Sequence, residues 1–435
     1  MFRRFLPFIL VGALSTLFLL SVFSGRQLSW RNIPQLIGFG EGYGPTEEQI
    51  ASGENILPDL RQGKSEQPDE EEWRTFKEPK IENMSPYPQG KTKPAGSNYT
   101  KTLVIPRLKS EPVGWIEEEL GDLIEARLLK TAVYTVDDRK AKLHPPKNKG
   151  HEVMVYLSYI IDNYENLPDV AIFMHAHRFA WHNNEIMDTD AAQMVRHLSP
   201  ERVTREGYMN LRCHWDPGCP DHIHPGETQR NADKQEEVIL AECWEELFPF
   251  EPIPTVLAQP CCAQFAVSRE TILRIPKMRY IFMRDWITRT ELSDYLSGRI
   301  FEYTWQYIFS AAPIHCPSMS ACYCDGYGLC FGSPSNFDKW FEIRFRLNEY
   351  KEDLRVWEEK ADKIEAWRKD TKDGKFLEEA ELFVPEYGKD VKLRNKIREL
   401  KEDLNQRRKE AFERGKDPKQ RAKESGRDWK EGDGF

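Results

Sequence analysis

Three histidines follow a short apolar run near the middle of the chain, and their types and spacing could do chemistry. The run at residues 170–174, VAIFM, is continuously apolar, which is typical of a strand covered on both faces. His175 and His177 lie two residues apart on an extended chain and so project to one face, and His182 could fold back toward them. Three imidazoles can ligate zinc or iron, which predicts a metal-dependent hydrolase. The alternative is that the rings hydrogen-bond the backbone at a polar strand end.

Further polar and aromatic side chains in this segment are candidates for binding a substrate. They are Arg178, Trp181, His182 and Asn183. In open α/β sheets, ligands bind beyond the carboxyl ends of the strands, because the loops converge there. We therefore expect these four residues to line a substrate site.

Four aspartates are candidate ligands for a divalent cation. Asp137 and Asp138 follow a predicted strand and would lie at the same sheet edge as His175, and Asp188 and Asp190 form the only Asp-x-Asp of the chain. Carboxylate oxygens suit Mn²⁺ or Mg²⁺, which transferases of the GT-A type hold against the diphosphate of a nucleotide sugar. The alternatives are a solvated turn for the first pair and a helix cap for the second.

An acidic residue within an aromatic helix is a candidate catalytic base. The sequence at residues 297–309 predicts an amphipathic helix that carries Glu302 beside Phe301 and Tyr303. A carboxylate enclosed by such rings suits a general base. The competing interpretation is a buried glutamate that pairs with Arg299 for structural reasons alone.

The net charge of −9 and the pI near 5.7 argue against a nucleic-acid-binding protein, which would show a basic face.

An apolar run near the N-terminus indicates the compartment. The uncharged apolar run at residues 5–23 would span roughly 28 Å as a helix, enough to cross a bilayer. We expect a retained signal anchor and a type II protein of a Golgi-like lumen. The alternative is a cleaved signal peptide and a secreted protein.

Nine cysteines at residues 213–330 would be oxidised in such a lumen. The short spacing of Cys213 and Cys219 predicts a disulfide between them. We expect Cys261 and Cys262 to pair with cysteines elsewhere, because neighbouring cysteines cannot readily bond each other. The last four cysteines predict a stapled loop. Because nine is odd, one thiol is free or forms an intermolecular bond.

The globular part predicts an α/β fold with a mostly parallel, Rossmann-like sheet that resembles the GT-A arrangement. We expect strands at residues 103–105, 131–136 and 170–174, with helices between them at residues 113–129 and 153–164. This β-α-β-α-β order implies right-handed crossovers and parallel strands.

Shifts in composition divide the chain into five segments. We expect a signal anchor at 1–26, a disordered stem at 27–100, the globular domain at 101–332, a charged helical extension at 333–400 and a disordered tail at 401–435. The stem carries two glycosylation sequons, at Asn83 and Asn98.

Several ordered blocks resemble the fungal domain of unknown function 3431 family. They are GHEVMVYLSYIIDNYENLPDVAIFMHAHRFAWHNN, GYMNLRCHW, PCCAQFAVSRETI, SGRIFEYTWQYIF and CYCDGYGLC, within residues 101–332. The resemblance implies a lumenal or secreted domain, commonly behind a single anchor, with no assigned reaction. The order of the anchor, the Asp-x-Asp, the AQFAVSRETI block and the Glu-x-x-Trp helix is more loosely similar to GT-A glycosyltransferases.

Three hypotheses follow. The leading one is a membrane-anchored lumenal glycosyltransferase that uses a nucleotide sugar, Mn²⁺ or Mg²⁺, and Glu302 as base. The second is the hydrolase built on His175, His177 and His182. The third is a non-catalytic, disulfide-stapled module whose C-terminal helix, with an apolar stripe at residues 347–364, recruits a protein partner.

Overall fold

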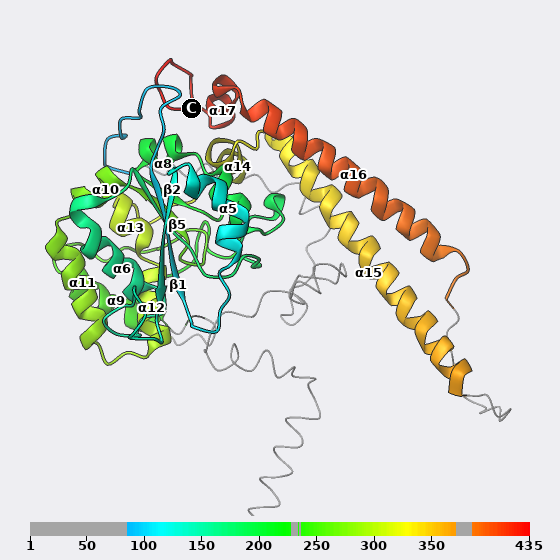
Figure 1. Cartoon of the computed structure of the whole chain (residues 1–435), viewed down its shortest axis with the longest axis horizontal. Coiled ribbons are helices and arrows are strands. Elements are labelled where there is room, and N and C mark those ends of the chain that lie inside the picture. Colours follow the sequence, from blue (N-terminus) through cyan, green and yellow to red (C-terminus); the bar gives the residue numbers. More distant parts are fainter. Residues whose placement is uncertain (1–84, 228–233, 235, 371–384) are drawn as a thin grey trace, which may run out of the picture.

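The computed structural model describes residues 85–227, 234, 236–370 and 385–435. They form an α/β domain from which a two-helix arm projects (Figure 1). The predicted signal anchor and most of the predicted stem lie outside the described residues. Within the described part of the chain, no helix is both long and apolar enough to cross a membrane.

A five-stranded mixed sheet forms the centre of the domain. Its strands are β1 (Lys101–Arg107), β2 (Leu129–Thr135), β3 (Val170–Phe173), β4 (Tyr208–Asn210) and β5 (Phe265–Ser268), in the order β2-β1-β3-β5-β4. β1 pairs in parallel with β2 and with β3, as the β-α-β-α-β pattern predicts. β5 is antiparallel to both β3 and β4.

The reversed β5 makes the sheet mixed, where the sequence predicted a mostly parallel one. The long connection between β4 and β5 leaves and re-enters the sheet at one edge, where the Leu211 amide donates to the Gln264 carbonyl at 2.9 Å. A strand that starts at the edge where its neighbour ends must run antiparallel to that neighbour.

Helices cover both faces of the sheet (Figure 1). They are α5 (Trp115–Glu125), α6 (Val153–Asn163), α7 (Ala191–His197), α8 (Pro200–Glu206), α9 (Glu237–Leu247), α10 (Arg269–Arg274), α11 (Lys277–Arg289), α12 (Asp294–Glu302), α13 (Trp305–Ser310) and α14 (Met319–Tyr327). Short 3₁₀ turns are η4 (Tyr164–Asn166) and η5 (Glu185–Met187). The helix predicted at residues 297–309 is therefore two helices.

The apolar run of β3 packs into two cores, one on each face of the sheet. Ala171 and Phe173 join the core that includes α6, α9 and α13, whereas Val170, Ile172 and Met174 join the core that includes α5, α7 and α14. This alternation confirms that β3 is covered on both faces. It places the residues after β3 at the end of a buried, fixed strand.

Four disulfides form, and their pairing differs from the predicted one. Cys213 bonds Cys322, Cys219 bonds Cys316, Cys324 bonds Cys330 and Cys261 bonds Cys262. The predicted Cys213–Cys219 bond is wrong because the loop after β4 packs against the start of α14, about 100 residues away. The expectation for Cys261 and Cys262 is also wrong. Cys243 is the free, buried thiol that an odd count requires.

The charged extension forms an antiparallel helical hairpin, the arm, made of α15 (Pro334–Asp370) and α16 (Lys389–Gly415). The Trp340 indole donates to the Leu404 carbonyl at the base, and the Trp357 indole donates to the Glu386 carbonyl further out. The base of the arm packs on the domain, where Trp340 and Leu404 join the core on the α14 side. Helix α15 and the start of α16 lie within the residues 333–400 for which a charged helical extension was predicted.

The prediction of a disordered tail at residues 401–435 is wrong. α16 runs to Gly415, α17 (Pro418–Glu424) follows, and both return to the domain (Figure 1). The Glu424 carboxylate accepts the amides of Phe331 and Gly332, and Arg205 donates to the Gly434 carbonyl at 2.6 Å. The tail is highly charged, and several of its charged side chains, such as Glu424 and Arg427, have partners on the domain.

The last part of the predicted stem also packs on the domain. Lys93 pairs with Asp169 at 2.7 Å, and the Gly90 amide donates to the Arg205 carbonyl at 2.9 Å. Residues 85–100 are thus an ordered part of the domain, not of a disordered stem. Asn98, in the second sequon, is exposed on this segment, as an N-glycan would require.

We predict that Asp325→Asn destabilises the protein strongly. The Asp325 carboxylate is fully buried and pairs with Arg202 at 2.6 Å, with Arg205, and with Arg421 at 3.6 Å. Loss of its charge leaves three largely buried guanidinium groups without their counter-ion, at a cost of about 3–5 kcal/mol. Urea unfolding of the full chain measures this. Asp362→Asn, on the exposed surface of α15, is the control and should change the free energy of unfolding by less than about 0.5 kcal/mol.

Candidate functional site

Several loops meet at one edge of the sheet, which we call the carboxyl edge. β1, β2, β3 and β4 all end there, and β5 begins there. The loop after β3 contacts the segment before β5, because the His175 amide donates to the side-chain oxygen of Gln264 at 3.1 Å. The sequence predicted this edge as the site, and most of the candidate residues do lie on its loops.

Buried amide side chains hold these loops together. The Asn183 oxygen accepts from Gln264 at 3.0 Å and its nitrogen donates to the Thr189 carbonyl at 2.9 Å. The Asn184 amide bridges the Leu211 carbonyl and the Cys213 amide, each at 2.8 Å. Both asparagines are fully buried. Asn183, predicted to bind substrate, therefore positions the loop that carries Trp181 and His182.

The structure brings together two of the three histidines. His175 and His182 are buried, with ring centroids 5.0 Å apart in an edge-to-face arrangement. His177 lies instead against Glu111 in the loop after β1, at 3.5 Å. The chain leaves the extended conformation after β3, so the spacing of two residues does not keep His175 and His177 side by side.

The described residues contain one group of three close ligand atoms suited to a metal ion, and it is Cys324, Cys330 and Glu424. The two cysteines of this group form a disulfide, so their sulfur atoms are not thiolate ligands. Neither the three histidines nor the four aspartates gather in this way. The geometry of the described chain therefore gives no support to the predicted metal sites.

Asp137 and Asp138 form a turn that binds Lys109. Asp137 accepts the Lys109 amide at 2.8 Å, and Asp138 pairs with the Lys109 ammonium group at 3.0 Å. That hydrogen bond from Lys109 lowers the pKa of Asp138. Both contacts are exposed, which matches the alternative of a solvated turn.

The side chains of Asp188 and Asp190 contact different partners. Asp190 caps α7 by accepting the Ala192 amide at 2.8 Å, and it also pairs with Arg178 at 3.0 Å. Asp188 has a left-handed backbone (φ 56°) and an exposed side chain that pairs with Arg408 of the arm. The Asp-x-Asp thus contributes one helix cap and one contact with the arm.

Arg178 and Trp181 have different environments at the carboxyl edge. Arg178 is held in ion pairs with Glu119 and Asp190, at 2.8 and 3.0 Å. Trp181 is 41% exposed, and the guanidinium group of Arg212 lies over its ring at 5.2 Å. Trp181 is the most exposed of the predicted substrate residues. Arg212 was not predicted, because nothing in its local sequence shows that the loop after β4 crosses Trp181.

Glu302 ends α12 and lies beside the segment that leads into β5. One carboxylate oxygen accepts the Cys262 amide at 2.9 Å, and the other lies 3.7 Å from Arg299. The Glu302 carbonyl also accepts from Gln259 at 2.7 Å. Its side chain keeps 17% of its surface exposed. The carboxylate is thus fixed in place without being closed off from solvent.

Arg299 joins Glu302 to a second, buried acid that the sequence did not indicate. Its guanidinium group binds Glu236 at 2.8 Å, and Glu236 also accepts from the Tyr303 hydroxyl. Arg299 is therefore shared between two carboxylates. The predicted pairing of Glu302 with Arg299 exists, but the shorter contact of Arg299 is with Glu236.

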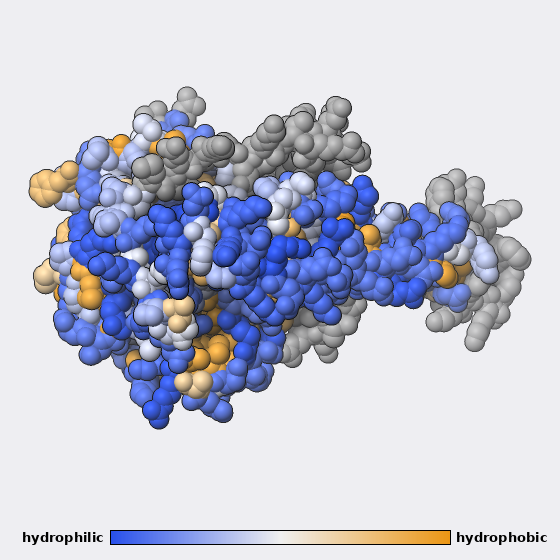
Figure 2. All heavy atoms as spheres, turned by 90° about the horizontal axis from the view of Figure 1, so that it is seen from above, coloured by the Kyte–Doolittle hydropathy of each residue, from blue (hydrophilic) through white to orange (hydrophobic). Residues whose placement is uncertain are grey.

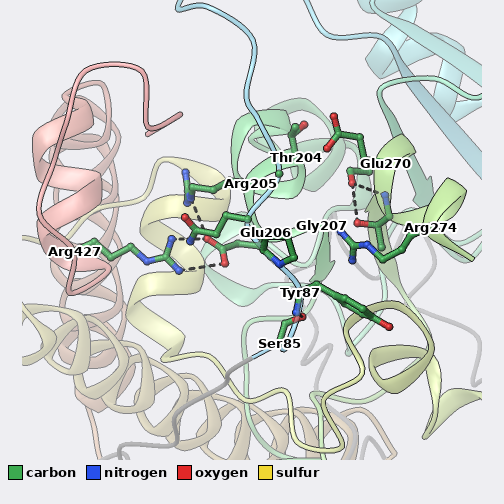
Figure 3. A pocket seen from close by; sticks show the side chains of 14 residues that line it. Ser85, Tyr87, Thr204, Arg205, Glu206, Gly207, Glu270, Arg274 and Arg427 are labelled. Carbon is green, nitrogen blue, oxygen red and sulfur yellow. Dashed lines mark hydrogen bonds and ion pairs between the residues drawn. The ribbon is translucent and has the colours of Figure 1, made fainter.

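A polar cavity of about 210 Å³ lies at the opposite edge of the sheet, between the N-terminal segment, α8 and α10 (Figure 3). Glu206 pairs there with Arg205 at 3.0 Å and with Arg427 at 2.7 Å. Burial would raise the pKa of Glu206, but Arg202, Arg427 and Arg205 together lower it to about 2. None of the predicted site residues lines this cavity.

A family model described as "Protein of unknown function (DUF3431)" matches residues 103–325, just over half of the chain. The chain belongs to the DUF3431 family. The match runs from β1 into α14 and includes the whole carboxyl edge, whereas the arm lies beyond it. No curated protein and no solved structure matches this DUF3431 protein.

We predict that His214 makes the protein sensitive to acid. His214 bonds the Tyr323 hydroxyl at 2.8 Å, and burial lowers its pKa to about 4. The unfolded chain takes up this proton near pH 6.5, so the contribution of His214 is complete above pH 6.5 and is lost as the pH falls toward 4. A single proton gives a slope of up to about 1.4 kcal/mol per pH unit.

Urea unfolding of wild type and His214→Gln between pH 7.5 and pH 4 tests this. The variant should lose stability less steeply than wild type between pH 6.5 and pH 4. His144→Gln, in the loop after β2, is the control and should keep the wild-type slope. Equal slopes for wild type and His214→Gln would show that His214 does not titrate as described.

Proposed function

We propose that the DUF3431 domain is a glycosyltransferase-like enzyme whose carboxyl edge binds a nucleotide sugar, with Glu302 as the general base. The observation that carries the proposal is the Glu302 carboxylate. It is held at 2.9 Å by the Cys262 amide and remains 17% exposed, at the edge where α/β folds bind ligands. A base needs both a fixed position and access to the acceptor hydroxyl.

Trp181 and Arg212 support binding of a charged sugar donor at this edge. An exposed indole offers a flat apolar face for a sugar ring, and the guanidinium group of Arg212 over that ring, although largely buried, adds positive charge to this part of the edge. Arg212 is itself held in place, since it donates to the Trp181 carbonyl at 3.3 Å and to the Asp216 carbonyl at 2.7 Å. The pair is therefore preorganised.

The four aspartates predicted to hold a cation do not lie around one point. In this proposal, the positive charge near the diphosphate therefore comes from arginine. A role for Mn²⁺ or Mg²⁺ stays a prediction that the experiment below tests. The hydrolase alternative needs three imidazoles around one ion, and the separation of His177 from the His175–His182 pair does not favour it.

Four disulfides indicate an extracellular or secretory-pathway location. We propose further that residues 5–23 retain the protein in the membrane as a type II anchor, which suits an enzyme of a Golgi-like lumen.

We predict that Glu302→Gln abolishes transfer but not donor binding. Thermal unfolding of the full chain against a panel of nucleotide sugars, with and without Mn²⁺, first identifies the donor. Saturation at about 100 times Kd stabilises the protein by about 2.7 kcal/mol. Glutamine can still accept the Cys262 amide, so the variant should keep this shift. Release of nucleotide in the presence of acceptor should fall by about 10²–10⁴-fold.

Glu270→Gln, at the opposite edge of the sheet, is the matched control and should retain both donor binding and transfer. Unchanged transfer by Glu302→Gln would reject Glu302 as the base. If no donor shifts the unfolding of wild type, the transferase proposal itself is wrong.

A second candidate function, recruitment of a protein partner, is favoured by the arm. Figure 2 shows a mostly hydrophilic arm with isolated apolar residues toward its outer end. In the part of the arm far from the domain, Tyr387 is 99% exposed and Val391 is 56% exposed. A hairpin that projects from the domain and exposes an aromatic ring suits docking to a partner with an apolar surface.

We predict that replacing both Tyr387 and Val391 with serine removes such contacts without unfolding the protein. Cross-linking mass spectrometry on the tagged full chain in its own membranes measures them. Cross-links from α16 to another protein should fall at least about tenfold, because exposed aromatic anchors dominate interfaces. Glu402→Gln, exposed on the same helix, should leave them unchanged. Cross-links that persist in the double variant would place the interface elsewhere.

A further inference from the structure

The disulfide between Cys261 and Cys262 differs from the two long-range disulfides in its effect on stability. The bonds Cys213–Cys322 and Cys219–Cys316 span 109 and 97 residues. Cross-links of that length stabilise a protein by closing long loops, which restricts the unfolded chain. Cys261 and Cys262 are adjacent, so their bond restricts almost nothing in the unfolded chain. Its effect must therefore be on the local conformation.

The backbone beside this bond is unusual. Cys262 and Ala263 both have positive φ, at 87° and 47°. Left-handed backbone at residues other than glycine is strained, and such residues cluster at functional sites. The segment is held from one side by the loop after β4, where the Cys261 amide donates to the Pro217 carbonyl at 3.1 Å.

This conformation directs the Cys262 amide to Glu302. The amide donates to the carboxylate at 2.9 Å, and Gln259, three residues earlier, donates to the Glu302 carbonyl at 2.7 Å. The same short segment therefore holds both the side chain and the main chain of Glu302. If the disulfide opened, the backbone could leave the left-handed region and the amide would no longer face the carboxylate.

The bond is also accessible, since Cys262 is only half-buried. The cysteines of two other disulfides, Cys213–Cys322 and Cys324–Cys330, are each at most 1% exposed. The bond between Cys219 and Cys316 is the closest comparison, because Cys219 is half-buried while Cys316 is 2% exposed.

We propose that Cys261–Cys262 is a thiol–disulfide exchange site that accepts electrons from a dithiol, and that its reduction releases Glu302. A thiolate of the dithiol attacks the Cys262 sulfur, the S–S bond breaks, and Cys261 leaves as a thiolate that takes up a proton. The second thiol of the dithiol then displaces Cys262 from the mixed disulfide. Two electrons and two protons pass to the protein, and the dithiol becomes a disulfide.

The exchange itself does not depend on sugar transfer. Only its consequence for activity rests on the proposed function, through Glu302. A chain that binds no nucleotide sugar can still show the exchange, so the failure of one proposal is distinguishable from the failure of the other.

The first test is the order in which the disulfides open in the native full chain. The protein is titrated with dithiothreitol, quenched with isotope-coded iodoacetamide and analysed by mass spectrometry. Cys261 and Cys262 should be labelled at least about tenfold faster than Cys219 and Cys316, while the buried thiol of Cys243 stays unlabelled and reports that the fold is intact. Labelling of Cys261 and Cys262 together with or after Cys219 and Cys316 would overturn the proposal.

The second test is hydrogen exchange of the peptide that contains the Cys262 amide. Reduction should speed its exchange at least about tenfold, and replacing both Cys261 and Cys262 with serine should give the same fast exchange without reductant. Glu302→Ala should also speed it in the oxidised protein, because the acceptor is gone. An amide that stays equally protected after reduction would show that the disulfide does not position Glu302.

Discussion

The packing of α8, α14 and α17 depends on the ion pairs of one buried carboxylate, that of Asp325. It gathers Arg202 and Arg205 from α8 and Arg421 from α17, so one negative charge joins helices that are far apart in sequence. Such a charge is stable inside a protein only with its partners in place. The tail must therefore fold back onto the domain for α14, which carries Asp325, to be buried.

Helix α14 carries this constraint to the carboxyl edge. On the same helix as Asp325, Cys322 bonds Cys213, and the Tyr327 hydroxyl donates to the Leu211 carbonyl at 2.6 Å. Both contacts fix the loop after β4, which holds Arg212 over Trp181. The site is thus supported by a covalent bond and a buried charge that lie outside it, and the Trp181 ring remains exposed to a ligand.

Local features of the chain were predictable from sequence, and long-range ones were not. The apolar run at residues 170–174 indicated a strand covered on both faces, because consecutive apolar side chains of a strand point to opposite faces of the sheet. The pairing of Cys213 with Cys322 and the reversal of β5 depend on segments about 100 or more residues apart, or on where a long connection re-enters the sheet. Charge composition also misled at residues 401–435, because it cannot show that Arg421 pairs with the buried Asp325.

In the candidate site, too, the features set by the local sequence were predictable and those set by distant segments were not. The edge of the sheet was predictable, since it depends only on where strands end, but the roles of single residues were not. Asn183 and Asp190 are polar residues in the predicted places whose bonding capacity the protein itself uses, for a loop contact and a helix cap. Glu302 differs because its partners, a backbone amide and a shared arginine, hold the carboxylate while leaving it partly exposed. Fixed position combined with remaining access separates a residue that can act on a ligand from one that supports the fold.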